Sequence, residues 1–367
     1  MKLSYAARLI CLLILPLTAV SQFRKYSNEF LNIGAGARGL AMGSAQVSST
    51  VDATAGYWNP AGLTGVDQTS VNFMHASYFS NIAKYDYGSV AIPISDNKRT
   101  LGISVLRFAV DDIPNTLFLV EPDGSINYGN IQTFSSADYA FLFSFAQKIK
   151  DEDDYKMSFG ANAKVIYRKV GHFAQAFGFG LDAGFRIRKD NWSIGVVAKD
   201  FTTTFNAWTF NFSEKEKEVL YLTKNDIPIK STELTAPRLT FGGGYDFSLG
   251  KSFNLLAEAD FDVTFDGRRN TLLSGNSISI DPHLGLEAAI NNVFFIRAGV
   301  TNFQKALSDG DTTNQKKVWV YQPGLGAGFK IKKLSLDYAF SNLANQSNPL
   351  YSHIFSLTFD LSKKEKR

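Results

Sequence analysis

The stretch Phe253-Asn-Leu-Leu-Ala-Glu-Ala-Asp-Phe-Asp-Val-Thr-Phe-Asp266 decides the fold class of this 367-residue chain. Its odd positions are all apolar, whereas most even positions carry Asn, Glu or Asp. A period of two residues is that of a β-strand, whose successive side chains point to opposite faces. One apolar face and one charged face are typical of a strand between lipid and a polar lumen.

The same alternation recurs in 177–188 and in 351–361, almost at the C-terminus. Fourteen segments of this kind predict an all-β, antiparallel, fourteen-stranded transmembrane barrel, and an even number is usual in bacterial barrels. We expect the strands at 67–79, 83–94, 97–111, 132–149, 154–170, 174–189, 191–204, 235–249, 252–266, 277–291, 293–303, 317–331, 333–342 and 351–362.

The connections between these segments alternate in length. Those after even-numbered strands are tight, as at 190–191 and 332–333, whereas most of those after odd-numbered strands are long. The long ones are 112–131, 205–234, 267–276, 304–316 and 343–350. Outer-membrane barrels have short periplasmic turns and longer extracellular loops, so both termini are predicted to lie in the periplasm.

The first residues predict export. Lys2 and Arg8 precede the apolar run 9–17, and Ala19-Val-Ser21 is a small-residue cleavage site, so 1–21 is a predicted signal peptide. Cys11, the single cysteine, lies within it, so the mature chain is predicted to have no disulfide and no thiolate chemistry. Removal of the signal peptide lowers the formal charge of the chain from +4 to +2, because Lys2 and Arg8 are lost and no acidic residue is. So small a net charge implies no nucleic-acid partner.

Residues 22–66 are predicted to form an N-terminal extension and hatch inside the barrel 67–362, and 363–367 a charged tail. The hatch contains Asp52-Ala-Thr-Ala-Gly-Tyr-Trp-Asn-Pro-Ala-Gly-Leu63, in which Asn59, Pro60, Ala61 and Gly62 have turn chemistry. The alternative is an ordinary loop before the first strand. Upstream, Gly34-x-Gly36-x-x-Gly39 matches a dinucleotide fingerprint, but no βαβ unit surrounds it, so glycine packing is favoured and no cofactor is expected.

Catalytic and metal-binding residues are not predicted. The four histidines, at positions 75, 172, 283 and 353, lack metal-ligand spacing. Glu258, Asp260 and Asp262 share one strand face, and a structural lumen network with arginines such as Arg107, Arg186 and Arg188 is favoured over paired-carboxylate catalysis. In the long loops, Phe118, Trp208, Phe210 and Phe212 are candidate partner-binding anchors. The alternatives are that these loops fold back as lids or that they belong to strands that extend beyond the membrane.

The glycine-rich run Asn32-Ile-Gly-Ala-Gly-Ala-Arg-Gly-Leu-Ala-Met-Gly43, followed by 52–63, resembles the PorV/PorQ family of Bacteroidota, within the wider FadL-like group. The resemblance covers about forty residues and implies a fourteen-stranded barrel with Asn59, Pro60 and Ala61 in its hatch. It further implies a non-enzymatic component of the type IX secretion system that contacts outer-membrane lipid. Its implied partners are the translocon barrel and the C-terminal signal domains of secreted proteins.

A second hypothesis is a FadL-like channel for long-chain fatty acids or other hydrophobic small molecules. It predicts an apolar pocket beneath the long loops and a kinked strand that gives lateral exit, for which Gly242-Gly-Gly244 is the candidate. A plain structural barrel is the third reading.

Overall fold

The computed structural model describes residues 27–94, 97–121, 123–228, 230–307, 316–342 and 351–361. The predicted signal peptide and charged tail, and the connection 343–350, lie outside them. Within this part of the chain no helix is long and apolar enough to span a membrane.

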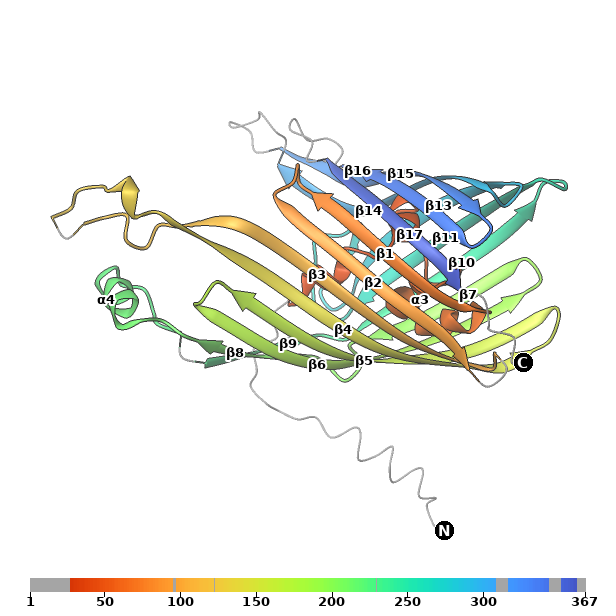
Figure 1. The fold of residues 1–367 in the computed structure, drawn as a ribbon, viewed down its shortest axis with the longest axis horizontal. Coiled ribbons are helices and arrows are strands. Elements are labelled where there is room, and N and C mark those ends of the chain that lie inside the picture. Colours follow the sequence, from red (N-terminus) through yellow and green to blue (C-terminus); the bar gives the residue numbers. More distant parts are fainter. Residues whose placement is uncertain are drawn as a thin grey trace, which may run out of the picture.

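One antiparallel sheet closes on itself, because the first strand pairs with the last from Thr69↔Leu361 to Ser77↔His353 (Figure 1). The strands are β1 Thr69–Tyr78, β2 Ala83–Ile94, β3 Arg99–Asn115, β4 Gln132–Asp151, β5 Tyr155–Val170, β6 Ala174–Lys189, β7 Trp192–Lys199, β8 Thr204–Phe210, β9 Lys230–Thr235, β10 Arg238–Ser248, β11 Phe253–Thr264, β12 Leu273–Ser274, β13 Ser279–Ile290, β14 Phe294–Leu307, β15 Lys317–Ile331, β16 Leu334–Ser341 and β17 Ser352–Leu361.

These segments make fourteen positions around the barrel, as predicted. β7 and β8 pair with successive parts of β6, and on their other side β7 pairs with β10 and β8 with β9. Segments β7 and β8 therefore form one interrupted strand, and β9 and β10 form another. The two-residue β12 pairs with β13 in the connection that follows β11. A closed barrel leaves few backbone groups without hydrogen-bond partners, which is the condition for crossing lipid with strands.

The alternation predicted for 253–266 is present in β11. Glu258 and Asp260 point inward and are buried, whereas Phe261 points outward and is exposed. Many other strands alternate in the same way, with their apolar residues on the outside.

The two barrel ends differ. One end, here called the short-turn end, carries the tight turns at 190–191 and 332–333. The opposite, long-loop end carries the longer connections 116–121 with 123–131 and 211–228, although the connections 79–82 and 171–173 at this end are also short.

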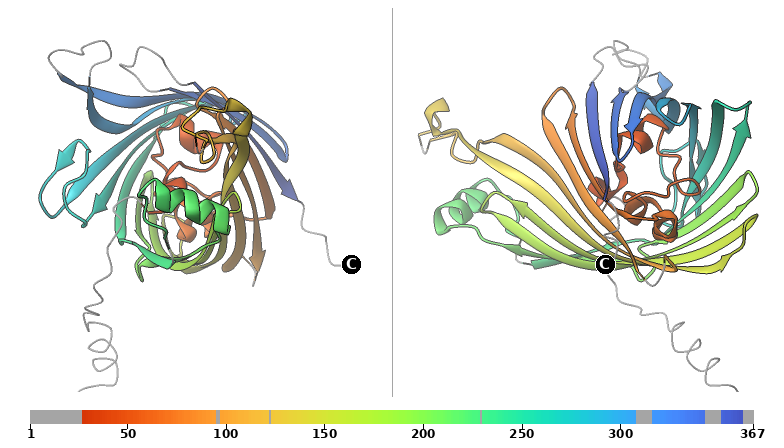
Figure 2. Two further views of the ribbon diagram at one scale, coloured as in Figure 1. Left: turned by 90° about the vertical axis from the view of Figure 1, so that its left-hand side faces the viewer. Right: turned by 45° about the vertical axis from the view of Figure 1, so that its right-hand side comes forward.

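Residues 27–66 form the hatch, which lies inside the barrel (Figure 2). It contains four short helices, η1 Glu29–Asn32, α2 Ala37–Ala41, α3 Ala55–Trp58 and η2 Pro60–Gly65. Most hatch side chains are buried, and Tyr57, Trp58 and Leu40 join the core formed with β1, β2 and β4. Without the hatch, this apolar cluster would lose most of one side.

Inward-facing glycines of the wall let the hatch approach the strand backbone. A Cβ at Gly299 would overlap Met42 and Gly43, and one at Gly160 would overlap Pro60 and Ala61. Gly242 and Gly244 serve the same purpose, because a Cβ there would crowd Val47 and Ser48. The strand is not interrupted at 242–244, since β10 pairs there without a register shift on both sides.

Part of the wall continues beyond the barrel on one side (Figure 1). The segment 205–234, predicted to be a loop, is instead β8, the helix α4 Glu214–Leu222 and β9. A capping box between Ser213 and Glu216 explains where α4 begins. Beside it, β3 and β4 run on past a bulge at Val110/Ile113 and end in a long hairpin that includes η3 Tyr128–Asn130. We call this projecting part, residues 111–138 and 204–235, the extension.

Substituting Gly299 by alanine is expected to destabilise the folded protein by about 1–3 kcal/mol, because a methyl group must enter a site already filled by hatch backbone. The measurement is the thermal unfolding midpoint of the mature protein in detergent. Gly243→Ala is the matched control, since a Cβ there meets no atom within 4 Å. Equal shifts in the two variants would contradict the tight seat of the hatch.

Candidate functional site

The hatch is held by two carboxylates of β11. Asp260 Oδ2 accepts the backbone N–H of Gln46 at 2.7 Å and of Val47 at 2.9 Å. Glu258 Oε1 accepts the N–H of Ser48 at 2.8 Å, and the hydroxyl of Ser48 donates to the same oxygen at 2.7 Å. These carboxylates, predicted to form a lumen network, are therefore acceptors for the hatch backbone.

The arginines predicted to neutralise them behave differently. Arg186 Nε donates to the carbonyl of Ser48 at 2.6 Å, which adds a further bond to the same hatch segment. Arg188 pairs with Asp246 at 3.2 Å and does not touch the hatch. Arg107 pairs with Asp86 of β2 at 3.0 Å, and in β3 it follows the exposed side chains of positions 101, 103 and 105 on the outer face, so its predicted place in the lumen is wrong.

A second anchor lies on the neighbouring strand β13, which pairs with β11. Arg38 of α2 binds Glu287 of β13 through Nε at 2.9 Å and Nη2 at 3.1 Å. Glu287 also accepts from Arg297 at 2.5 Å, and Arg297 reaches Asp337 at 2.6 Å. Burial alone would lower the pKa of Arg38, but the adjacent Glu287 carboxylate outweighs it and raises that pKa. The hatch cation is thus one member of an alternating chain of charges.

The predicted hatch residues Asn59, Pro60, Ala61 and Gly62 all lie buried in the lumen. The Asn59 side chain is 0% exposed, and its Nδ2 donates to the carbonyl of Val47 at 2.8 Å and to that of Phe185 in the wall at 3.2 Å. Its Oδ1 accepts the N–H of Ala61 at 3.1 Å, which starts η2 with Pro60 in the first turn.

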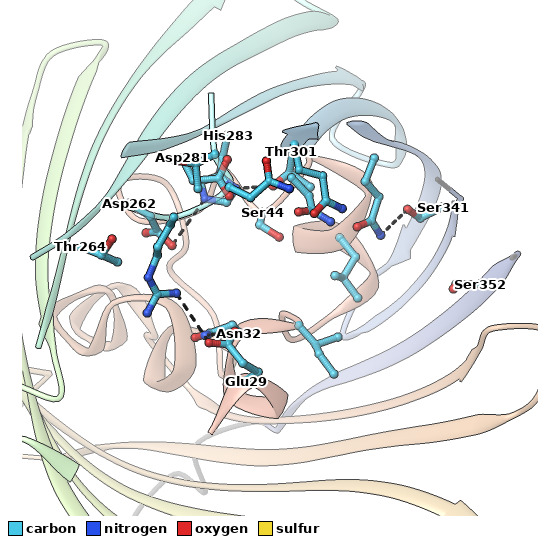
Figure 3. Close-up of a pocket in the computed structure, with 18 of the residues that line it drawn as sticks. Glu29, Asn32, Ser44, Asp262, Thr264, Asp281, His283, Thr301, Ser341 and Ser352 are labelled. Carbon is cyan, nitrogen blue, oxygen red and sulfur yellow. Dashed lines mark hydrogen bonds and ion pairs between the residues drawn. The ribbon is translucent and has the colours of Figure 1, made fainter. Parts of the chain in front are cut away.

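A cavity of about 450 Å³ remains between the hatch and the wall, and Tyr78, Phe79, Ser341 and Asn342 at the long-loop end help to line it. Figure 3 shows charged and polar side chains converging on it from the hatch and from several strands. Arg238 pairs with Asp262 at 3.0 Å, and His283 Nε2 lies 3.6 Å from the same carboxylate. Most of the lining residues are polar or charged, although Ile33, Leu40, Tyr78 and Phe79 also contribute, so the predominantly apolar pocket predicted by the channel hypothesis is not found at this position.

The predicted anchors Trp208, Phe210 and Phe212 belong to β8 and the residues after it, and not to a loop. Their rings stack in a row, with centroids 6.3 and 6.4 Å apart. The row continues to Phe173 at 5.9 Å, and the guanidinium of Arg168 lies 5.1 Å from the centre of the Trp208 ring. Half-buried and mutually packed, these rings stiffen the extension.

The fourth predicted anchor, Phe118, lies in the connection between β3 and β4. It is half-buried, and Lys215 Nζ of α4 lies 4.9 Å from its ring centre. Phe118 therefore links the β3–β4 hairpin to α4.

Other apolar side chains at the tips of the extension are more exposed. Tyr221 of α4 is 77% exposed and Tyr128 of η3 is 72% exposed, and Leu222, Val120 and Ile126 are also exposed. Sequence reasoning missed Tyr221 and Leu222, because they follow the run Glu214-Lys-Glu-Lys-Glu218, whose density of charge is typical of a solvated segment. A capping signal at Ser213 was available and would have identified the helix.

The interrupted strand contains a buried ion network. Between β7 and β8, Asp200 accepts from Lys164 and from Thr204, and Lys164 also lies 2.7 Å from Asp182 of β6. Hatch residues meet the wall just beyond, where Asn28 Nδ2 donates to Thr235 Oγ1 at 2.9 Å. The extension and the start of the hatch are therefore in direct contact.

The described residues contain no group of three or more His, Cys, Asp or Glu that could hold a metal ion. The histidines have separate neighbours: His75 contacts Asp86, His172 contacts Glu216, His283 contacts Asp262 and Thr301, and His353 contacts Tyr338.

No protein-family model matches the chain, and no curated protein matches it in sequence. Among solved structures it is similar to the Ralstonia pickettii toluene transporter TbuX, with a TM-score of 0.56 and 13% identity over 90% of this chain and 99% of that one. The CymD monoaromatic hydrocarbon channel is similar with a TM-score of 0.53 and 11% identity, over 90% of this chain and 98% of that one. The P. putida toluene transporter TodX is similar with a TM-score of 0.52 and 11% identity, over 90% of this chain and 99% of that one.

At such identities the likeness establishes the fold alone. The predicted fourteen-stranded, FadL-like barrel with an N-terminal segment in its lumen is confirmed. The proteins that share the fold are named as transporters and channels.

Substituting Asp260 by alanine removes the acceptor for two buried N–H groups, each of which costs about 1–3 kcal/mol when unsatisfied. We expect amide hydrogen exchange at Gln46 and Val47 to become at least about tenfold faster. Asp246→Ala is the control, because this lumen-facing carboxylate pairs with Arg188 and not with the hatch. Unchanged exchange in Asp260→Ala would show that the hatch is held by other contacts.

The attachment of α4 should depend on pH through Glu216. Burial pushes the pKa of Glu216 up, but the N–H and hydroxyl of Ser213 and the ring of His172 outweigh burial and lower it below the usual 4.5. Because the pKa of Glu216 is lowered in the folded state, its ionised carboxylate stabilises the folded form above pH 4.5. This stabilisation is lost as the pH falls through the folded-state pKa. Amide hydrogen exchange at 213–217, corrected for intrinsic rates, should therefore accelerate only below pH 4.5. Glu216→Gln should abolish this dependence of exchange on pH.

Proposed function

We propose that this protein is a non-enzymatic outer-membrane component of the type IX secretion system, of PorV type. In this proposal the extension faces outward from the cell and docks the C-terminal signal domain of a secreted protein, and both termini lie in the periplasm. The lipid-facing wall meets the translocon barrel. The observation that carries the proposal is the one-sided extension with exposed apolar side chains at its tips.

The lumen supports docking over conduction of an apolar substrate. The hatch fills it with buried contacts to β1, β2 and β4 and to the glycines of other strands. The cavity that remains is lined by paired charges such as Arg238 and Asp262. A site for an apolar ligand is instead lined mainly by hydrophobic side chains with few polar groups. An apolar solute would lose its favourable transfer from water in such a lining.

The extension has the properties of a docking surface. Its aromatic row, from Trp208 to Phe212 and on to Phe173, is packed internally and provides a stiff support. Tyr221 and Leu222 on α4, with Tyr128 on the neighbouring hairpin, present apolar area to the outside. Rigid supports with a few exposed aromatic anchors are typical of interface hot spots.

A channel for hydrophobic small molecules is the second candidate. It is favoured by the fold shared with toluene transporters and by the interruption of the wall between Lys199 and Thr204. Under this candidate, deletion of the gene should abolish uptake of a labelled fatty acid or aromatic hydrocarbon. Unchanged uptake would exclude it.

The docking proposal predicts that mature protein purified from solubilised outer membrane carries a translocon barrel and secreted proteins, identified by mass spectrometry. Substituting both Tyr221 and Leu222 by serine should reduce the recovered secreted protein at least about tenfold, since two exposed apolar anchors contribute roughly 2 kcal/mol or more. The barrel should fold normally, because neither residue joins its core.

Glu214→Ser with Glu218→Ser is the matched control on the same helix, because both carboxylates are exposed. This variant should recover as much secreted protein as the wild type. Recovery of neither translocon nor secreted protein with the wild-type barrel would contradict the proposal.

A further inference from the structure

The extension ends in two strand edges, because the barrel is not closed at this level. On one side β9 pairs with β8, and it pairs with no other strand among the described residues. On the other side β3 pairs with β2 only as far as Ala83↔Val110, so 111–115 lie beyond its last partner there. Unpaired edges present rows of N–H and C=O groups that can join another strand.

The register identifies the groups on the β9 edge. Asn211 N donates to Phe173 O on the β6 side, so the even-numbered residues of β8 direct their backbone toward β9. Asn206 lies opposite Glu233 and Trp208 opposite Ser231, so these β9 residues bond to β8. The N–H and C=O of Thr232 and Leu234 therefore point to the free edge.

The two edges differ in how they are protected. The β3 edge contains Asp111, Asp112 and Pro114, has a bulge, and places Asp112 at φ 56°. Proline, charge and bulges are the devices by which natural proteins block edge pairing. The β9 edge, Lys-Ser-Thr-Glu-Leu-Thr, has no proline and no register shift, and a single lysine at its start is the one charge that shares the outward face with Thr232.

The surroundings indicate what kind of partner fits this edge. Lys230 and Thr232 on the outer face are exposed, as is Thr209 opposite Lys230. The outer face is polar at Lys230, Thr232 and Thr209 and becomes apolar toward the barrel, where the exposed Phe205 lies opposite Leu234. The polar end is unsuited to lipid chains, and only an extended backbone supplies donors and acceptors at strand spacing. The edge belongs to the same hairpin as Tyr221 and Leu222, so it is continuous with the proposed docking surface.

We infer that β9 binds a β-strand of the secreted protein by edge addition, through the backbone of Thr232 and Leu234. This inference rests on the proposed docking function and specifies its mode. Main-chain hydrogen bonds would supply affinity for many different cargo sequences, and the exposed apolar tips would supply area. The cargo segment is an extended strand with an unpaired edge of its own.

Thr232→Pro tests the inference, because it removes an N–H that points away from β8 and so leaves the β8–β9 pairing intact. Thr232→Val is the matched control, which keeps the N–H and the side-chain shape. The probe is the purified C-terminal domain of an exported protein that co-purifies with the wild-type barrel. Thr232→Pro should weaken binding at least about tenfold, and Thr232→Val should bind as the wild type does.

Hydrogen exchange provides the second readout. The amides of Thr232 and Leu234 should exchange freely in the mature protein alone and become protected in the complex. Equal binding by Thr232→Pro, or free exchange in the complex, would overturn the edge inference and leave docking standing. Protection before the probe is added would overturn it as well, because the chain itself or a second copy would then occupy the edge. Failure of the wild type to bind would overturn both.

Discussion

Everything in this barrel depends on how the backbone of the hatch is satisfied inside the lumen. The segment 46–49 has no regular secondary structure, so its N–H groups need acceptors from elsewhere. Glu258 and Asp260 provide them, and Arg186 binds the carbonyl of Ser48. The polar face of a transmembrane strand, which in a porin would line water, here replaces the partners that a helix or sheet would have given.

A close approach of hatch and wall is possible only because the wall strands carry glycine at the contact points. Gly160 and Gly184 receive the Asn59–Ala61 turn, and Gly299 receives Met42 and Gly43. The extension is attached to the same assembly, since Asn28 bonds to Thr235 and Asn206. A partner bound to the extension is thus connected to the hatch through a few hydrogen bonds.

The strand count and the inward face of β11 could be predicted from the sequence, because period-two patterning depends only on the polarity of each side chain. The hatch could be predicted too, from glycine density and turn residues around Asn59. The interruption at 200–203 could not, since Asp200-Phe-Thr-Thr203 contains no glycine or proline to mark a break, although the buried positions change from odd numbers in β7 to even numbers in β8. Trp208 and Phe210 were assigned to a loop because α4 separates the paired strands β8 and β9, and pairing across such a distance leaves no local signal.

The exposed tips, the stiff aromatic row and the polar, hatch-filled lumen together favour a barrel that displays a surface over one that conducts an apolar solute. The most direct test of a lumen filled by its own hatch is the conductance of the purified mature protein in a planar lipid bilayer. The account predicts no steady ion current, because residues 27–66 occupy the bore. A stable, continuously open pore in the wild-type protein would contradict it.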